Sequence, residues 1–281
     1  MTVPQPDTLK RPIPSTKERI TAVGLGTYGV FDAGLSKTAR DPLREVLRLF
    51  VEGGGGMVDS SPMYGSAERV VGDLAGDLAV RDALFLATKV WTSGREAGVR
   101  QMEDSFRLLR TNVIDLMQVH NLMDWETHFE TLRAWKEEGR IRYAGITHYA
   151  MSAFRTMEHI MKTAHPDFIQ ICYSIVTREA EERLLPLAAD LGIGVIVNRP
   201  FETAGLFGKV RGKPLPPWAK EFECASWAQF FLKFILSNPA VTCAIPATGN
   251  AAHVLDDRKA GYGALPDIRM RKKMVHYIDT L

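Results

Sequence analysis

Short apolar runs alternate with longer amphipathic runs along nearly the whole chain. The short runs hold few polar residues, as in parallel strands that are buried on both faces. Eight such runs predict strands at residues 20–27, 56–60, 84–90, 114–120, 143–148, 168–174, 194–198 and 241–246.

Helical periodicity fills the intervals between these runs. Residues 42–52 place Leu43, Val46, Leu47 and Phe50 on one stripe, which is the spacing of a helix that covers a core. Further helices are predicted at residues 67–78, 99–109, 128–138, 152–163, 179–191, 225–236 and 251–259. Eight successive βα units predict a single-domain α/β fold, the (β/α)8 or TIM barrel. Without a linker-like stretch, residues 1–281 are expected to form one domain, with residues 1–18 as an N-terminal tail or a cap over the barrel floor.

Composition narrows the choice of function. The 281 residues include 35 Lys plus Arg and 33 Asp plus Glu, and a net charge of +2 gives no strong field to attract a nucleic acid. No apolar run reaches the roughly 18 residues of a membrane span. The first residues lack the apolar segment of an export leader, so a cytoplasmic location is expected, with a leader removed earlier as the open alternative. Three scattered cysteines indicate buried thiols, and no metal site is expected.

Candidate chemistry lies at the carboxyl ends of the predicted strands, where barrels carry their sites. Asp59 ends the second strand and Tyr64 follows it, Lys89 ends the third, and His120 ends the fourth. A buried lysine requires a partner, and Asp59 on the neighbouring strand is one. A lysine cation near Tyr64 would lower the pKa of the phenol, and His120 could orient a carbonyl group. These four residues predict protonation of a carbonyl oxygen while its carbon receives a hydride.

The same segments resemble the aldo-keto reductases along most of the chain. One match is the stretch 59–68, in which Asp59, Tyr64, Gly65 and Glu68 form the family's Asp-x4-Tyr-Gly-x2-Glu pattern. The other matching segments, in order, are GLGTY (24–28), LATKV (86–90), DLMQVHN (115–121), KEEGRIRYAGITHY (136–149), IQICYS (169–174), NRPF (198–201) and IPATGN (245–250). The resemblance implies an NAD(P)H-dependent oxidoreductase that reduces an aldehyde or ketone to an alcohol. Tyr64 would be the proton donor, Lys89 would depress its pKa, Asp59 would pair with Lys89, and His120 would position the carbonyl.

The resemblance also implies a cofactor site. Its residues would be Gly26, Thr27, Tyr28, Asp59, Thr147, His148, Gln170, Asn198, Arg199, Phe201, Ala247, Thr248, His253 and Asp257. His148 stands where the family has Asn, and Asn198 where many members stack an aromatic ring on the nicotinamide. Ala247 and His253 replace the cations that many members place near the 2′-phosphate, although Arg258 could compensate. NADPH remains the expected cofactor, and NADH is possible.

Aromatic residues after the strands predict the substrate pocket. Tyr28, Trp91, Asn121 and Trp125 are the expected substrate contacts, and they favour an apolar or aromatic carbonyl. The segment 205–224 is either a lid or a surface loop. A cofactor-binding regulatory subunit with little turnover is the alternative function, and a metal-dependent hydrolase is a weaker one. The protein is expected to act as a monomer or small homo-oligomer without nucleic-acid or membrane partners.

Overall fold

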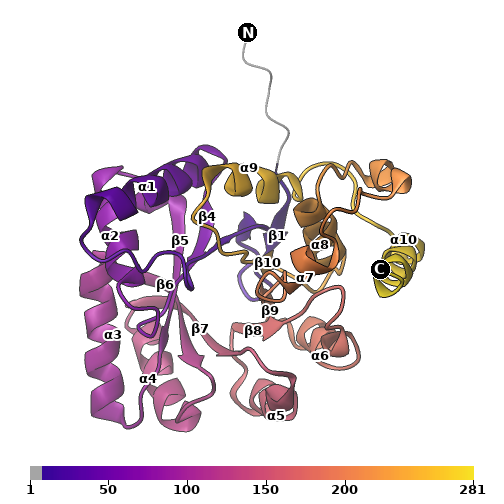
Figure 1. Cartoon of the computed structure of the whole chain (residues 1–281). Coiled ribbons are helices and arrows are strands. Elements are labelled where there is room, and N and C mark those ends of the chain that lie inside the picture. Colours follow the sequence, from indigo (N-terminus) through magenta and orange to yellow (C-terminus); the bar gives the residue numbers. More distant parts are fainter. Residues whose placement is uncertain (1–7) are drawn as a thin grey trace.

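A barrel of eight parallel strands, surrounded by helices, forms the centre of the computed structural model, which describes residues 8–281 (Figure 1). The barrel strands are β3 (Leu25–Gly26), β4 (Gly56–Asp59), β5 (Leu84–Val90), β6 (Ile114–His120), β7 (Ile141–His148), β8 (Phe168–Cys172), β9 (Gly194–Asn198) and β10 (Cys243–Ala244). The amides of Gly24 and Gly26 each donate to a carbonyl of the β10 segment, Ala244 and Pro246, at 2.8 Å. These bonds join the first and last strands, so the predicted (β/α)8 barrel is confirmed.

Helices follow the strands in the predicted order. They are α1 (Lys37–Glu52), α2 (Ala67–Asp77), α3 (Arg95–Leu109), α4 (Trp125–Glu137), α5 (Phe154–Ala164), α6 (Leu184–Leu191), α7 (Gly205–Lys209), α8 (Trp227–Leu236), α9 (Ala251–Lys259) and α10 (Ile268–Asp279). The short 3₁₀ helices are η1 (Arg81–Ala83), η2 (Met151–Ala153), η3 (Glu179–Glu181) and η4 (Pro217–Phe222). The helices α7 and α10 are additions to the predicted set.

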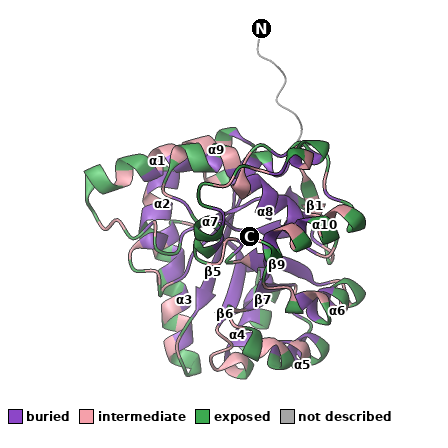
Figure 2. Cartoon of the chain, turned by 45° about the vertical axis from the view of Figure 1, so that its right-hand side comes forward, coloured by how far each residue is buried: buried purple, intermediate pink, exposed green. Residues whose placement is uncertain are grey.

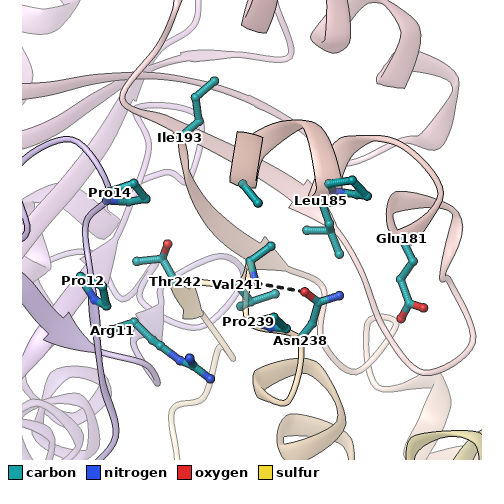
Figure 3. A pocket seen from close by; sticks show the side chains of 13 residues that line it. Arg11, Pro12, Pro14, Glu181, Leu185, Ile193, Asn238, Pro239, Val241 and Thr242 are labelled. Carbon is teal, nitrogen blue, oxygen red and sulfur yellow. Dashed lines mark hydrogen bonds between the residues drawn. The ribbon is translucent and has the colours of Figure 1, made fainter. Parts of the chain in front are cut away.

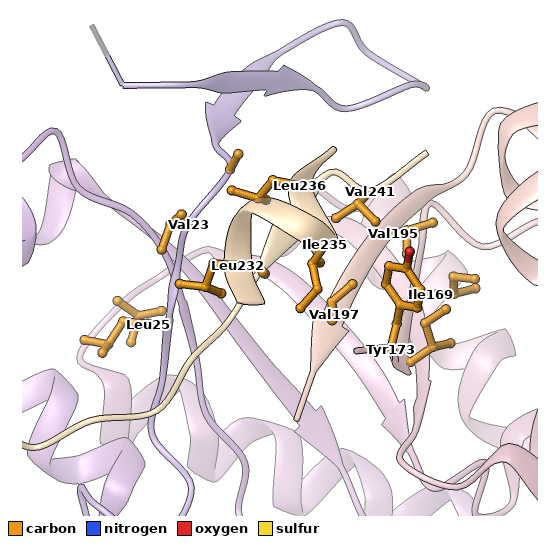
Figure 4. Close-up of a cluster of buried hydrophobic side chains, with 14 of the residues drawn as sticks. Val23, Leu25, Ile169, Tyr173, Val195, Val197, Leu232, Ile235, Leu236 and Val241 are labelled. Atoms are coloured by element: carbon orange, nitrogen blue, oxygen red, sulfur yellow. The ribbon is translucent and has the colours of Figure 1, made fainter. Parts of the chain in front are cut away.

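Successive side chains of a strand point to opposite faces, and both faces of these strands are buried, which explains why the strands are almost wholly apolar. In β9, Val195 and Val197 point outward into the main hydrophobic cluster, where Val197 lies beside Ile235 of α8 and Val195 beside Val241 (Figure 4). Ile196 between them belongs to a second cluster of buried side chains inside the barrel. Each strand therefore needs apolar residues on both faces, and the buried residues concentrate in the strands and the inner helix faces (Figure 2).

The floor of the barrel is covered by an antiparallel hairpin of β1 (Lys10–Pro12) and β2 (Arg19–Thr21). Ile13 and Ile20 of this hairpin pack with interior residues such as Phe85 and Phe168. Residues 8–18 thus cover the floor, while residues 1–7 of the expected tail or cap lie outside the described residues. A cavity of about 400 Å³ lies beside the hairpin, between Arg11, Leu185 and Thr242 (Figure 3), at the amino-terminal end of the strands.

Four strand predictions were too long: 56–60 and 168–174 extend past β4 and β8 by one and two residues, and two others differ more. The run 20–27 divides into β2 of the hairpin and β3 of the barrel. Gly24 lies at this change of direction, and a Cβ there would come within 2.8 Å of the Met57 carbonyl oxygen, so the close approach requires glycine. The run 241–246 contributes only Cys243–Ala244 to β10, because its other residues bond as irregular chain.

The segment 205–224 is largely built into the body of the protein. Leu206, Val210, Ala219 and Phe222 are buried in the main hydrophobic cluster. The structure therefore favours a fixed surface segment over a lid for this stretch.

Candidate active site

A buried ion pair lies at the carboxyl end of β4 and β5. The side chain of Lys89 is fully buried, and its Nζ donates to Asp59 Oδ2 and to the Ser60 carbonyl oxygen, both at 2.6 Å. Burial alone would lower the pKa of Lys89, but the charge of Asp59, together with Tyr64, raises it. Lys89 is therefore an ammonium ion held in a water-poor environment, where its charge acts strongly on its neighbours.

Tyr64 is the neighbour that Lys89 affects most directly. Lys89 Nζ lies 4.9 Å from the centre of the Tyr64 ring, and the ring is also packed edge-on against Tyr28 at 5.1 Å. Burial raises the pKa of Tyr64, and Lys89 opposes that change by lowering it. The expected effect of Lys89 is thus present but smaller than that of burial, so the phenol stays protonated at neutral pH and can donate a proton.

The His120 ring packs edge-on against the Tyr64 ring, with 5.8 Å between the ring centres. Burial, with the nearby Lys89 charge and His148, lowers the pKa of His120 to about 2, so the imidazole is neutral. Its Nδ1 lies 2.9 Å from Ser61 Oγ, and Ser61 Oγ itself accepts from the Met63 amide at 3.3 Å. Ser61 can therefore donate its hydroxyl proton to Nδ1, which leaves Nε2–H as the donor of His120.

Four amide and hydroxyl side chains continue the polar cluster across the barrel. Gln118 and Gln170 donate to Asp59 Oδ1 at 3.2 and 2.8 Å. Gln170 Oε1 accepts from Thr147 Oγ1 at 3.0 Å and from Asn198 Nδ2 at 3.4 Å. Five strands, β4 and β6 to β9, thus contribute to one hydrogen-bonded network around Asp59.

Sequence reasoning missed Ser60, Ser61 and Gln118. Both serines directly follow Asp59 in the stretch 59–68. Gln118 precedes His120 by two residues, and alternate residues of a strand share a face. A polar residue on the inward face of an otherwise apolar strand was the signal that could have found Gln118.

One orphaned atom indicates where a polar ligand fits. Asn198 Oδ1 is buried and has no hydrogen-bond partner among the described residues, although such acceptors are normally paired. On β7, directly after the Thr147 that shares Gln170 with Asn198, His148 Nδ1 accepts from the Ala150 amide at 3.0 Å, so its Nε2 carries the proton. A free acceptor on Asn198 and a donor on His148 suit a carboxamide, which offers one group of each kind. The residues present therefore fit a nicotinamide.

The Arg199 guanidinium lies over the ring of Tyr149, which follows His148 in the loop after β7. His148 stacks on Tyr149, with ring centres 5.3 Å apart, and the Arg199 guanidinium lies 5.5 Å from the centre of the Tyr149 ring. Arg199 is exposed and also donates to Thr203 Oγ1 at 3.0 Å. Its charge is available to an anion at the mouth of the barrel.

Backbone strain gathers at the same end of the barrel. Of the twelve residues other than glycine with positive φ in the described chain, seven lie in the loops after β6 and β9. They are Asn121, Leu122, Asp124, Arg199, Glu202, Thr203 and Ala204. Such strain is costly and tends to occur where function requires it.

The other expected pocket residues divide into two groups. Tyr28 and Trp91 reach the site, since Tyr28 packs on Tyr64 and the Trp91 ring centre is 6.5 Å from that of His120. Asn121 directly follows His120, and its Oδ1 is buried without a partner among the described residues. In contrast, Trp125 packs against the main hydrophobic cluster, as does Phe201 of the expected cofactor site, which contacts Phe207 and Phe231.

The first strand supplies support for Asp59. Thr27 is fully buried and donates to the Asp59 carbonyl oxygen at 2.9 Å, so it holds the β4 backbone. Gly26 pairs with Ala247 across the closure of the barrel. A Cβ on Gly26 would lie 2.9 Å from the Ile245 carbonyl oxygen, which explains the glycine at this position.

The segment after β10 carries no fixed cation facing the mouth. Ala247 is exposed, and Thr248 Oγ1 lies 3.3 Å from His253 Nδ1. Burial, with the neighbouring charge of Asp256, raises the pKa of Asp257 to about 8. The suggestion that Arg258 compensates is wrong, because its guanidinium is buried and donates to the carbonyls of Leu49 and Gly53 at the carboxyl end of α1.

Metal-ligating clusters and membrane spans are both absent from the described part of the chain. No group of three or more His, Cys, Asp or Glu side chains among residues 8–281 could hold a metal ion. None of the helices in the same range is long and apolar enough to cross a membrane.

Comparison with known proteins identifies relatives of this chain. Residues 22–272 match the family model described as the aldo/keto reductase family. The chain is 29% identical over 213 residues to the aldo-keto reductase YhdN of Bacillus subtilis (strain 168), covering 70% of this chain and 63% of that relative's length. It is 29% identical over 248 residues to the methylglyoxal reductase YeaE of Escherichia coli (strain K12), covering 84% of this chain and 83% of that protein.

Solved structures of similar shape agree with the fold. An aldo-keto reductase from Klebsiella pneumoniae in complex with NADPH has a TM-score of 0.81 at 24% identity, covering 97% of this chain and 95% of that one. An aldo-keto reductase from Bacillus halodurans, in its holo form, has a TM-score of 0.78 at 22% identity, covering 97% and 96%.

Proposed function

Because the chain belongs to the aldo/keto reductase family, we propose that it reduces an aldehyde or ketone to an alcohol with NADPH, using Tyr64 as the proton donor. The observation that carries this proposal is the fully buried Lys89, bonded to Asp59 and lying 4.9 Å from the ring centre of Tyr64. A buried ammonium beside a phenol stabilises the phenolate that remains once the proton has left.

The cofactor supplies a hydride when it is bound. Asn198 and His148 offer a free acceptor and a free donor for its carboxamide, and Arg199 offers a charge for its pyrophosphate. The choice of NADPH over NADH draws on the Klebsiella pneumoniae neighbour in complex with NADPH. The segment from Ala247 to Asp257 lacks a fixed cation for the 2′-phosphate, so use of NADH as a second cofactor belongs to the proposal.

The protein groups act on the carbonyl oxygen. His120 Nε2–H donates a hydrogen bond to that oxygen and orients it beside the Tyr64 hydroxyl. As the carbonyl carbon accepts the hydride, the oxygen takes the phenolic proton of Tyr64, and the product is the alcohol. Lys89 stabilises the resulting phenolate, and Asp59 keeps Lys89 charged and in place.

An apolar substrate suits the mouth of the site. Eleven large hydrophobic side chains are exposed in the described chain, and eight of them lie in the segments that lead from a barrel strand to the next long helix. These eight are Tyr28, Leu35, Met63, Trp91, Tyr149, Met151, Val176 and Phe207. Apolar side chains grouped at one opening favour binding of an apolar or aromatic carbonyl compound.

The test is NADPH oxidation with a reactive aromatic aldehyde, in the wild type and in Tyr64→Phe. The variant should bind NADPH normally and lose most of its turnover, because only the proton donor is removed. Tyr277→Phe on α10 is the matched control and should keep wild-type turnover. Equal turnover in Tyr64→Phe would refute the assigned role. A wild type that binds NADPH but turns over no carbonyl compound would instead favour a regulatory cofactor-binding subunit.

A further inference from the structure

Gln118 is an amide buried inside the barrel, next to the ion pair. It lies on β6 in register with Lys89 on β5 and with Gly145 on β7, and its side chain is fully buried. A Cβ on Gly145 would lie 3.1 Å from Gln118 Cγ, closer than side chains ordinarily pack. The glycine therefore leaves the room that the glutamine occupies.

Both oxygens of Asp59 are bound, and they have different partners. Oδ2 accepts from Lys89 at 2.6 Å, whereas Oδ1 accepts from Gln118 at 3.2 Å and from Gln170 at 2.8 Å. A carboxylate held at both oxygens has little freedom to rotate. The amide donors on Oδ1 therefore fix the direction in which Oδ2 meets Lys89.

Gln170 is already fully engaged. Its Oε1 accepts two hydrogen bonds, from Thr147 and Asn198, and its Nε2 donates to Asp59 and, at 3.5 Å, to Gln118 Oε1. If Gln170 turns to a nicotinamide carboxamide, its amide has to give up one of these partners. Gln118 is then the donor that still holds Asp59 Oδ1 among the residues that the structure describes.

We propose that Gln118 is a positioning residue, which holds Asp59 Oδ1 so that Oδ2 stays on Lys89 and the ammonium stays beside Tyr64. The expected effect of Gln118 on kcat rests on the proposed function. Its expected effect on the pKa of the Tyr64 phenol does not. Removal of the Gln118 amide takes an N–H donor away from Asp59, and Asp59 then holds Lys89 less firmly. Both changes raise the pKa of Tyr64, because less positive charge remains to stabilise the phenolate.

The test uses Gln118→Met, which conserves volume and removes the donor. The titration of Tyr64 is measured from tyrosinate ultraviolet absorbance, as the difference between each protein and its Tyr64→Phe partner. The Tyr64 pKa should rise by roughly half a unit to one unit. With NADPH and an aromatic aldehyde, kcat should fall about tenfold or more, since a hydrogen bond to a charged group is lost, while the Kd for NADPH should change little.

Thr242→Val is the matched control. Thr242 is buried in the barrel wall at the amino-terminal end, and its Oγ1 accepts from the Val195 amide at 3.1 Å. This variant should lose a buried hydrogen bond without any change in the Tyr64 titration or in kcat. If Gln118→Met does not fold, Gln118→Glu replaces it, because a protonated glutamic acid keeps an O–H donor for Asp59.

Gln118→Glu should make kcat depend on a new ionisation, because a second carboxylate beside Asp59 repels it once deprotonated. Gln118→Met with wild-type titration of Tyr64 and wild-type kcat would overturn the inference. If only Gln118→Glu folds, a kcat that shows no new ionisation would overturn it instead. The absorbance titration needs no turnover. A wild type inactive on carbonyl compounds would therefore remove the proposed function, and the shifted titration would still support the placement of Asp59 by Gln118.

Discussion

Replacement of Lys89 by methionine removes the one cation that the proposed chemistry requires and keeps most of the side-chain volume. At an effective dielectric constant of about 20, a unit charge 4.9 Å from the Tyr64 ring centre is worth about 3.4 kcal/mol to a phenolate, or about 2.5 pKa units. The barrier to proton donation should rise by up to that amount, which lowers kcat by up to about 300-fold.

The same change should also destabilise the fold. Loss of one partner of a buried ion pair costs about 3–5 kcal/mol, because the other charge is left uncompensated. Here Gln118 and Gln170 still donate to Asp59, and protonation of Asp59 provides a second compensation. The expected loss in the free energy of unfolding is therefore near the lower end, about 3 kcal/mol.

A second buried lysine separates the two effects. Lys233 is also fully buried, but its Nζ donates to the Tyr262 and Ala264 carbonyls, away from the ion pair. Lys233→Met should lower the midpoint of thermal unfolding while single-turnover reduction keeps the wild-type rate. Lys89→Met should lower both the midpoint of thermal unfolding and the rate of single-turnover reduction. Near-normal reduction by folded Lys89→Met would refute the argument that the charge of Lys89 stabilises the Tyr64 phenolate.

Three further predictions concern the cofactor end and the dependence on pH. Ala247→Lys should tighten NADPH relative to NADH by about tenfold, the effect of one charge-assisted hydrogen bond, and an unchanged ratio of the two Kd values would mean that the 2′-phosphate binds elsewhere. Because the pKa of Asp257 is raised to about 8, the folded chain holds a proton that the unfolded chain releases, so stability should fall as pH rises from about 4 to about 8. Thermal unfolding of Asp257→Asn should lose part of this slope, and a slope equal to that of the wild type would contradict the assignment. Because the pKa of His120 is lowered to about 2, kcat/KM for reduction should show no ionisation of His120 between about pH 5 and pH 8, and NMR titration of the imidazole should find it neutral throughout.

The arrangement of the barrel could be predicted from the sequence because each strand and helix carries its own pattern. Strands buried on both faces, such as β5 and β6, are long apolar runs, and their predicted bounds agree with the structure. The first strand could not be divided correctly, since the change from hairpin to barrel at Gly24 depends on the close approach of the Met57 carbonyl. Such a contact between distant segments leaves no local pattern.

The candidate site could be predicted where residue type and strand position coincide. Asp59, Lys89 and His120 end neighbouring strands, so the sequence alone brings them close. The direction of a long side chain could not be predicted from residue type and strand position. Arg258 was considered as a substitute for the missing cations at the 2′-phosphate, but its side chain crosses to the carbonyl of Gly53. The balance between burial and Lys89 at Tyr64 likewise depends on packing that no spacing reveals.

The most direct measurement follows the hydride itself. Wild-type protein is incubated with an aromatic aldehyde and NADPH that carries deuterium at the position of hydride transfer, and the alcohol is analysed by mass spectrometry and NMR. The account predicts one deuterium on the carbinol carbon of the alcohol from the wild type, and almost no alcohol from Tyr64→Phe. An alcohol without deuterium, or equal amounts of labelled alcohol from both proteins, would contradict it.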